Sequence, residues 1–224
     1  MAHELIGYDD GTTDILIYDE IGADDWGAGI SAKDFVKDLA SLSGSDVKLR
    51  INSPGGAVSD GVAMYQALKN HKGKVTAVVE GMAASIATVV MLGADEVVAS
   101  KSSVIMIHHP WTVAFGNAKE LREMADVLDV FDETILNAYI EKTGASPDTL
   151  NELMDAESYL TAEAAMALGL VDRIEGEGEE VEKKDMKAAA KKPVSKVWKR
   201  QMAELRSKAA RVRFGLKVHN GLKR

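Results

Sequence analysis

The chain has no cysteine and no apolar run long enough to cross a bilayer. Without cysteine there can be neither a disulfide framework nor catalysis by a thiolate. Gly, Glu or Asp interrupts the longest apolar stretches before they reach the roughly 20 residues that a membrane-spanning helix needs. Residues Met1 to Tyr8 lack the basic start and the sustained apolar stretch of a signal peptide. We therefore expect a cytoplasmic protein.

Several motifs that would indicate other classes of function are also missing. The sequence contains no Gly-x-Gly-x-x-Gly pattern and no Gly-Lys-Ser/Thr ending, so it does not predict a phosphate-binding loop. It contains no His-Glu-x-x-His motif. The adjacent His108 and His109 would point in opposite directions on a strand, so they cannot both face one metal ion. We expect neither a cofactor nor a bound metal.

The net charge of −8 conceals two oppositely charged parts. From Lys183 onward the chain holds 15 Lys and Arg against two acidic residues, or +13, whereas the residues before it hold 12 against 33, or −21. Between them, Gly176 to Glu180 has the composition of a linker. We predict a folded domain over 1–175 and, over 176–224, a linker and a basic tail with a helical segment.

Strand and helix patterns alternate through the first half of the domain, which predicts an α/β fold with a largely parallel sheet. Strands are predicted over 14–19, 46–51, 75–79, 96–99, 104–107 and 170–174, and helices over 31–43, 59–71, 86–94 and 117–142, with two more that begin at Ser146 and Thr161. The helix over 117–142 carries an apolar stripe along its length. We expect this long helix to project from the domain as an assembly surface.

Ser85 is predicted to lie at a corner between the strand over 75–79 and the helix over 86–94. The residues just before it are small, among them Gly81, Ala83 and Ala84, so they leave its hydroxyl accessible. The free N–H groups at the start of the helix favour negative charge nearby. This setting suits a nucleophile, although a serine at such a corner more often only caps the helix.

Acyl transfer through a serine needs a base, a group that orients the base, and donors for the oxyanion. His108 follows the strand over 104–107, and Pro110 restricts the backbone just after it. His109 is its closest competitor, and spacing alone does not decide between them. Gly55 and Gly56 follow another strand and can turn backbone N–H groups outward, while the N–H of Ile86 directly follows the serine.

Four ordered segments resemble the signature segments of the ClpP family of serine peptidases. They are Ile51 to Gly56, Gly81 to Ser85, Met106 to Pro110, and Tyr159 to Asp172. The resemblance covers roughly residues 46–174. It implies the ClpP/crotonase fold, a spiral of strand-strand-helix units, together with peptide-bond hydrolysis and assembly into rings.

Carried over to this sequence, the resemblance makes Ser85 the nucleophile, His108 the base, and the N–H groups of Gly56 and Ile86 the oxyanion donors. The third member of the triad departs from the family, which has an aspartate here. The aligned residue is Glu157, with Asp155 as the reserve candidate. A glutamate can also accept the Nδ1 proton of a histidine and hold its tautomer.

The acidic loop around Trp26, the variant segment from Glu157 to Thr161 and the basic tail resemble the ClpP-related head maturation proteases of tailed phages. That likeness implies a homo-oligomer that cleaves scaffold and capsid proteins in the host cytoplasm or the assembling virion. The alternatives are a housekeeping ClpP-like subunit that works with an ATP-driven unfoldase, and a catalytically idle assembly protein. A crotonase-like acyl-CoA enzyme would need neither Ser85 nor His108. The basic tail is also compatible with a nucleic-acid contact.

Overall fold

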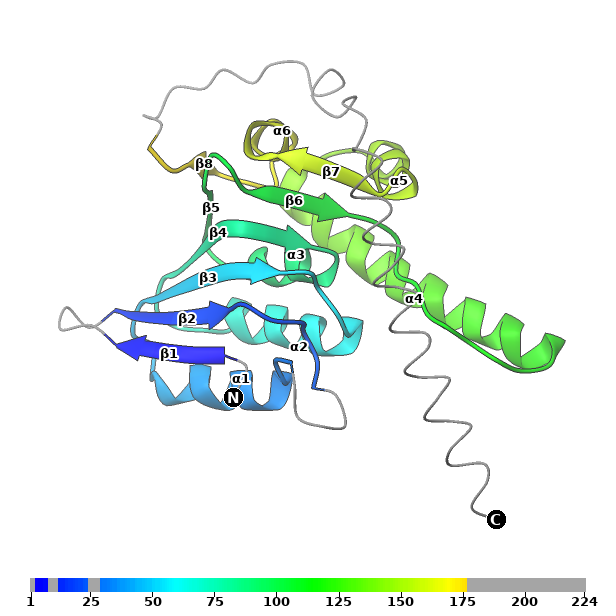
Figure 1. The fold of residues 1–224 in the computed structure, drawn as a ribbon, viewed down its shortest axis with the longest axis horizontal. Coiled ribbons are helices and arrows are strands. Elements are labelled where there is room, and N and C mark those ends of the chain that lie inside the picture. The colour runs from blue at the N-terminus through cyan, green and yellow to red at the C-terminus, as the bar shows by residue number, and fades with distance from the viewer. Residues whose placement is uncertain (1–2, 8–11, 24–28, 177–224) are drawn as a thin grey trace, which may run out of the picture.

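The computed structural model describes residues 3–7, 12–23 and 29–176, which form one α/β domain (Figure 1). The predicted helix in the basic tail and the loop around Trp26 lie outside the described residues. The elements in chain order are β1 (His3–Gly7), β2 (Thr13–Ile17), α1 (Ala32–Ser41), β3 (Val47–Ser53), α2 (Val58–Lys69), β4 (Val75–Ala84), α3 (Ile86–Met91), β5 (Glu96–Ala99), β6 (Val104–Ile107), α4 (Ala118–Thr143), α5 (Pro147–Asp155), β7 (Ser158–Thr161), α6 (Ala162–Leu168) and β8 (Arg173–Ile174).

The sheet is largely parallel, as the alternation of strands and helices predicts. Its main path runs β1-β2-β3-β4-β5-β8, and only the β1–β2 pair in this path is antiparallel. Strand β6 leaves the path, because it pairs in parallel with the end of β4 and antiparallel with β7. The edge strand β1 was not predicted from the sequence.

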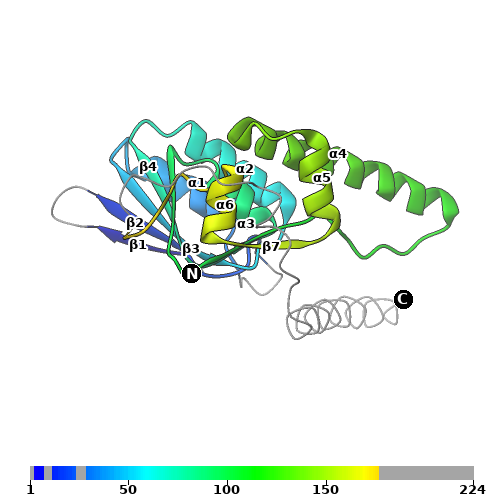
Figure 2. The same ribbon diagram turned by 90° about the horizontal axis from the view of Figure 1, so that it is seen from above.

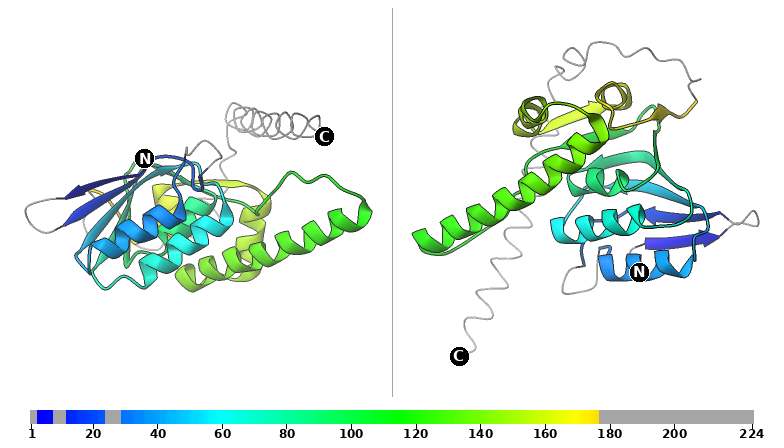
Figure 3. Two further views of the ribbon diagram at one scale, coloured as in Figure 1. Left: turned by 90° about the horizontal axis from the view of Figure 1, so that it is seen from below. Right: turned by 180° about the vertical axis from the view of Figure 1, so that it is seen from behind.

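Helices α1, α2 and α3 cover one face of the sheet, as seen from above in Figure 2 and from below and behind in Figure 3. The alternation in β3 fits this layering. Val47, Leu49 and Ile51 are buried, whereas Lys48 between them is exposed. Because side chains alternate along a strand, the apolar residues all face the helices and form the core with them.

Strand β4 is longer than the sequence predicts and serves two parts of the sheet. Its first half, Val75 to Val79, lies between β3 and β5. Its second half continues as a strand because Met82, Ala83 and Ala84 pair with β6. Strand propensity is low for Gly and Ala, so this extension depends on tertiary pairing rather than on local preference. It carries the extended backbone directly up to Ser85.

The helix starts predicted from capping residues are confirmed. The side-chain oxygens of Ser31, Ser146 and Thr161 accept backbone hydrogen bonds from the first turns of α1, α5 and α6. Helix α4 begins with a capping box formed by Asn117 and Glu120. It ends at Gly144, whose left-handed backbone terminates the helix.

Helix α4 projects from the body of the domain, as predicted (Figure 1). Only two of its residues are buried, Ile135 and Tyr139, both near its C-terminal end. Its first half presents large apolar side chains to solvent, with exposed fractions of 44% for Leu121, 47% for Val127 and 64% for Val130. The apolar stripe therefore enters the core at one end of the helix only.

Within the described part of the chain, every helix is too short or too polar to span a membrane.

Candidate active site

Ser85 occupies the corner between β4 and α3, and its backbone is in an unusual conformation. Its φ of 56° and ψ of −131° lie in a region that residues with a side chain rarely adopt. Its N–H donates to the carbonyl of Met106 in β6 at 2.9 Å. The hydroxyl makes no capping hydrogen bond to α3, so the ordinary role of a corner serine does not explain this residue.

The Ser85 hydroxyl instead contacts His108. The distance from Ser85 Oγ to His108 Nε2 is 2.7 Å, which is a hydrogen bond. The pairing of β4 with β6 brings the two residues together, because Ala84 lies opposite Met106 and each strand then leads into one member of the pair. His108 is only 6% exposed, so its ring is held by its surroundings. A histidine in hydrogen-bond contact with a serine is the arrangement of a base and its nucleophile.

The neighbouring histidine has a different set of partners. His109 Nδ1 lies 2.6 Å from a carboxylate oxygen of Asp132 in α4, and its Nε2 lies 3.2 Å from Asp155 in α5. Both ring nitrogens therefore face carboxylates, and His109 links two helices rather than facing Ser85. Of the other described histidines, His71 contacts the carbonyl of Ser45 at 2.8 Å.

The antiparallel pairing of β6 with β7 distinguishes the two carboxylate candidates. Ile107 lies opposite Ser158 in this register, and His108 and Glu157 are the residues directly next to that last pair, each just outside its strand. Glu157 follows the end of α5 with a φ of 47°, and its N–H donates to the carbonyl of Met154 at 3.0 Å. Asp155, the reserve candidate, is engaged with His109. The register thus favours Glu157 as the carboxylate beside His108.

The predicted oxyanion donors border the same corner. Ile86 is the first residue of α3, and the N–H groups of a first helical turn have no partner within the helix. On the other side, Ile21 donates to the carbonyl of Gly55 at 2.8 Å and accepts from the N–H of Ala57 at 2.7 Å. In a parallel bridge of this kind the N–H of the intervening residue, Gly56, points away from Ile21.

Two glycines allow the chain to pack this closely around the corner. A Cβ on Gly55 would lie 2.6 Å from the carbonyl oxygen of Ala84 and 2.7 Å from the Cβ of Ser85. A Cβ on Gly61 in α2 would lie 2.2 Å from a side-chain carbon of Ile86. Any side chain at either position would push the turn or the helix away from Ser85.

Sequence reasoning missed three polar residues around this site. Asp132 binds His109 from α4. Thr88 and Tyr139 form a buried hydrogen bond between α3 and α4, with 2.5 Å between their oxygens. The only signal for this pair was a polar residue within the apolar run of α3 and a tyrosine at the end of the α4 stripe.

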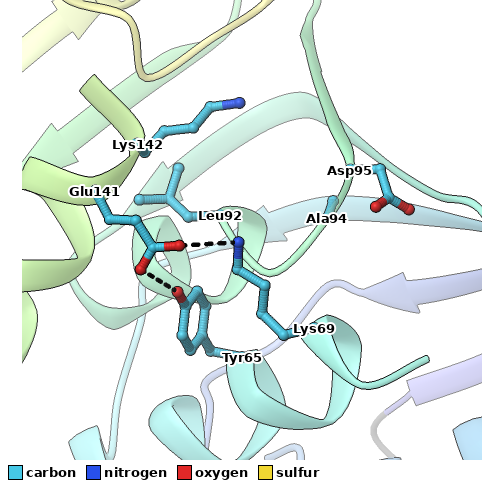
Figure 4. Close-up of a pocket in the computed structure, with 7 residues that line it drawn as sticks. All are labelled: Tyr65, Lys69, Leu92, Ala94, Asp95, Glu141 and Lys142. Carbon is cyan, nitrogen blue, oxygen red and sulfur yellow. Dashed lines mark hydrogen bonds and ion pairs between the residues drawn. The ribbon is translucent and has the colours of Figure 1, made fainter. Parts of the chain in front are cut away.

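A separate pocket of about 290 Å³ lies beside the C-terminal end of α4, and none of the candidate active-site residues lines it (Figure 4). Tyr65, Lys69 and Glu141 line it, and the Glu141 carboxylate accepts from the tyrosine hydroxyl at 3.5 Å and from the lysine at 3.3 Å. Burial raises the pKa of Tyr65 above its ordinary value. Among the described residues no group of three potential ligands is arranged to hold a metal ion.

Comparisons with known proteins relate most of the domain to one family. The family model described as Clp protease matches residues 13–178. ATP-dependent Clp protease proteolytic subunit 1 of Protochlamydia amoebophila is 31% identical over 160 residues, which are 68% of this chain and 78% of that protein. The Clp protease proteolytic subunit of Chlorella vulgaris is 36% identical over 127 residues, or 55% of this chain.

The match spans 63% of the Chlorella protein and, at 32% identity, 66% of the proteolytic subunit from Pleurastrum terricola. Among solved structures, a ClpP1 variant from Listeria monocytogenes superposes with a TM-score of 0.62 at 27% identity. That superposition covers 72% of this chain and 90% of the other. The mixed α/β architecture is therefore the ClpP fold, and this chain belongs to the Clp protease family.

Proposed function

We propose that the protein is a serine endopeptidase in which Ser85 is the nucleophile and His108 the general base. The observation that carries this proposal is the 2.7 Å hydrogen bond between Ser85 Oγ and His108 Nε2, made by a serine whose backbone is strained and whose hydroxyl does not cap its helix. Strained backbone conformations are concentrated at functional sites. Membership of a protease family supports the same conclusion.

The reaction would proceed through an acyl-enzyme. His108 Nε2 takes the hydroxyl proton as Ser85 Oγ attacks the carbonyl carbon of a peptide bond, and the oxyanion accepts hydrogen bonds from the N–H groups of Gly56 and Ile86. The imidazolium returns its proton to the leaving amine as the C–N bond breaks. A water molecule, deprotonated by His108, then attacks the ester and releases the acid and the free serine.

Glu157 completes the proposed triad by orienting His108. A carboxylate that accepts from Nδ1 keeps the base lone pair on Nε2, where the Ser85 hydroxyl lies. The β6–β7 register supports Glu157 for this role, whereas Asp155 lies against the other histidine.

For the substrate, we propose scaffold and capsid proteins cleaved during the maturation of a phage head, in the host cytoplasm or the assembling virion. The acidic segment around Trp26, the glutamate at position 157 and the basic tail support this proposal. A second candidate is a degradative subunit that receives unfolded chains from an ATP-driven partner. It is favoured by the names of the Chlorella and Protochlamydia relatives, which describe subunits of ATP-dependent proteases.

We further propose that the protein is a homo-oligomer, as a ring, with the first half of α4 in the contact between copies. The exposed side chains of Leu121, Val127 and Val130 support this, because a helix of a soluble monomer seldom presents three large apolar residues to water.

The nucleophile can be tested with a fluorophosphonate probe. Wild-type protein is expected to be labelled at Ser85, because the probe reacts with an activated serine and its phosphoryl oxygen occupies the oxyanion site. Ser85→Ala should abolish labelling, and Ser103→Ala should not, since the Ser103 hydroxyl is buried against the carbonyl of Ser100 at 2.7 Å. If neither wild type nor Ser85→Ala is labelled, the catalytically idle assembly protein is the better interpretation. If both are labelled equally, the probe reacts elsewhere and Ser85 is not the nucleophile.

The carboxylate can be tested by comparing two isosteric amides. Glu157→Gln should lower kcat at least about 100-fold, because the amide no longer selects the productive tautomer of His108. Asp155→Asn breaks only an exposed ion pair and should change kcat less than about fivefold. The kcat of each variant is measured with a small peptide ester, and Tm is the control for folding. If Asp155→Asn lowers kcat more than Glu157→Gln, Asp155 is the carboxylate that orients His108.

The substrate can be tested by co-expressing the protein with the scaffold and capsid proteins of a tailed phage. Wild type should produce discrete cleavages in scaffold and capsid protein that mass spectrometry locates, and Ser85→Ala should produce none. If these proteins stay intact while an unfolded model protein is degraded only with an ATP-driven unfoldase, the degradative role replaces head maturation.

Assembly can be tested by placing charge on the exposed face of α4. The double variant Val127→Glu, Val130→Glu should shift the mass measured by light scattering to that of a smaller species, because four carboxylates from each pair of copies would meet in the contact. Lys37→Glu, at an exposed position of α1, changes the net charge by the same amount away from this face and is the control. An unchanged mass for the double variant would exclude this face.

A further inference from the structure

The strained backbone of Ser85 is held on both of its sides by hydrogen bonds. Its N–H donates to Met106, and its carbonyl oxygen accepts from the N–H of Thr88 at 3.0 Å and from the hydroxyl of Thr88 at 2.5 Å. Holding a residue in a sparsely populated backbone conformation costs of the order of 1–3 kcal/mol of folding free energy, so the conformation persists only where the surroundings restrain it. The two bonds from Thr88 are such restraints on the carbonyl side.

The hydroxyl of Thr88 is itself held by Tyr139 of α4. Thr88 is completely buried in the otherwise apolar helix α3, and its Oγ1 lies 2.5 Å from the hydroxyl oxygen of Tyr139. The single proton of Thr88 is given to the Ser85 carbonyl, which has no proton to give, so the Tyr139 hydroxyl must donate to Thr88. In this series of hydrogen bonds, Tyr139 therefore donates to Thr88, and Thr88 donates to the carbonyl of Ser85.

The environment of Tyr139 keeps its proton in place. Its side chain is buried, and this burial raises the pKa of the phenol well above its ordinary value, with the charge of Asp132 adding to the effect. The hydroxyl therefore remains a donor throughout the pH range in which a histidine works as a base. Hydrogen bonds in series polarise one another at low dielectric, so the first bond strengthens the second.

We propose that Tyr139 is a positioning residue for the nucleophile, acting from α4 through the Thr88 hydroxyl on the carbonyl of Ser85. The proposal rests on the proposed role of Ser85. A threonine that bonds the carbonyl three residues earlier is common in helices. What is particular here is that this carbonyl belongs to the strained serine, and that the threonine is fixed by a fully buried hydrogen bond from the projecting helix.

The test is to remove the phenol oxygen alone with Tyr139→Phe, which keeps the ring. The second-order rate of fluorophosphonate labelling, and kcat for a peptide ester, should fall about three- to tenfold with KM unchanged, as expected for the loss of one buried hydrogen bond. Thr88→Val removes both hydroxyl contacts and should cost at least as much. The double variant should lower the rate no more than Thr88→Val alone, because both changes interrupt the same series of hydrogen bonds. Thr88→Ser keeps the hydroxyl and should restore most of the rate.

Tyr65→Phe is the matched control, because its hydroxyl also contacts α4, at Glu141, but has no path to Ser85. It should leave the labelling rate unchanged. If Tyr139→Phe lowers Tm while labelling and kcat equal those of wild type, Tyr139 is only a packing residue and the inference is wrong, although Ser85 remains the nucleophile. If wild type is not labelled at all, the proposed function fails, and this inference with it.

Discussion

The close approach of three chain segments at Ser85 is the constraint on which the rest of the structure depends. The turn after β3, the first turn of α2 and the start of α3 meet there with space for hydrogen atoms but not for a Cβ at Gly55 or Gly61. Within α2 an alanine would be favoured over Gly61 by about 1 kcal/mol in helix propensity alone. The glycine is explained by contact with Ile86, because overpacking of this kind costs more than the propensity returns.

This contact also determines where polar groups can gather. Because α2 packs closely against α3, the N–H groups of Gly56 and Ile86 border one corner. The serine between them faces His108, which follows the end of β6. The main path of the sheet contributes the serine, whereas His108 directly follows β6 and Glu157 directly precedes β7. The candidate site is therefore a junction between two substructures, and β4 connects them because it pairs with both.

Much of the fold could be predicted from local patterns. The bounds of β5 and β6 agree with the predicted strands because each is a short apolar run between turn residues, and the helix starts agree because capping residues act over three positions. The second half of β4 was not predicted, since Gly81 to Ala84 form a strand only by pairing with β6. Strand β1 was missed because five residues pairing at a sheet edge give too little pattern.

The site shows the same division. Residue patterns alone found Ser85 and the two histidines, and the family resemblance chose His108. The register of β4 against β6 gives the physical reason, because it brings His108 to the serine and leaves His109 beside Asp132. Likewise the resemblance placed Glu157 ahead of Asp155, whereas the physical argument for Glu157 is an antiparallel pairing of segments about 50 residues apart, which no local pattern contains. The hydrogen bond between Thr88 and Tyr139, 51 residues apart, is of the same kind.

The anchoring of α4 near one end makes it a lever with unequal arms. At 1.5 Å per residue, the helix extends about 25 Å from its first residue to Ile135 and only about 6 Å from Ile135 to Tyr139. If the rigid helix tilts about Ile135, Tyr139 moves about one quarter as far as the outer end. A neighbouring molecule that contacts the outer end can fit imperfectly, by an ångström or so, while the buried contacts beside Ser85 shift by only a few tenths of that.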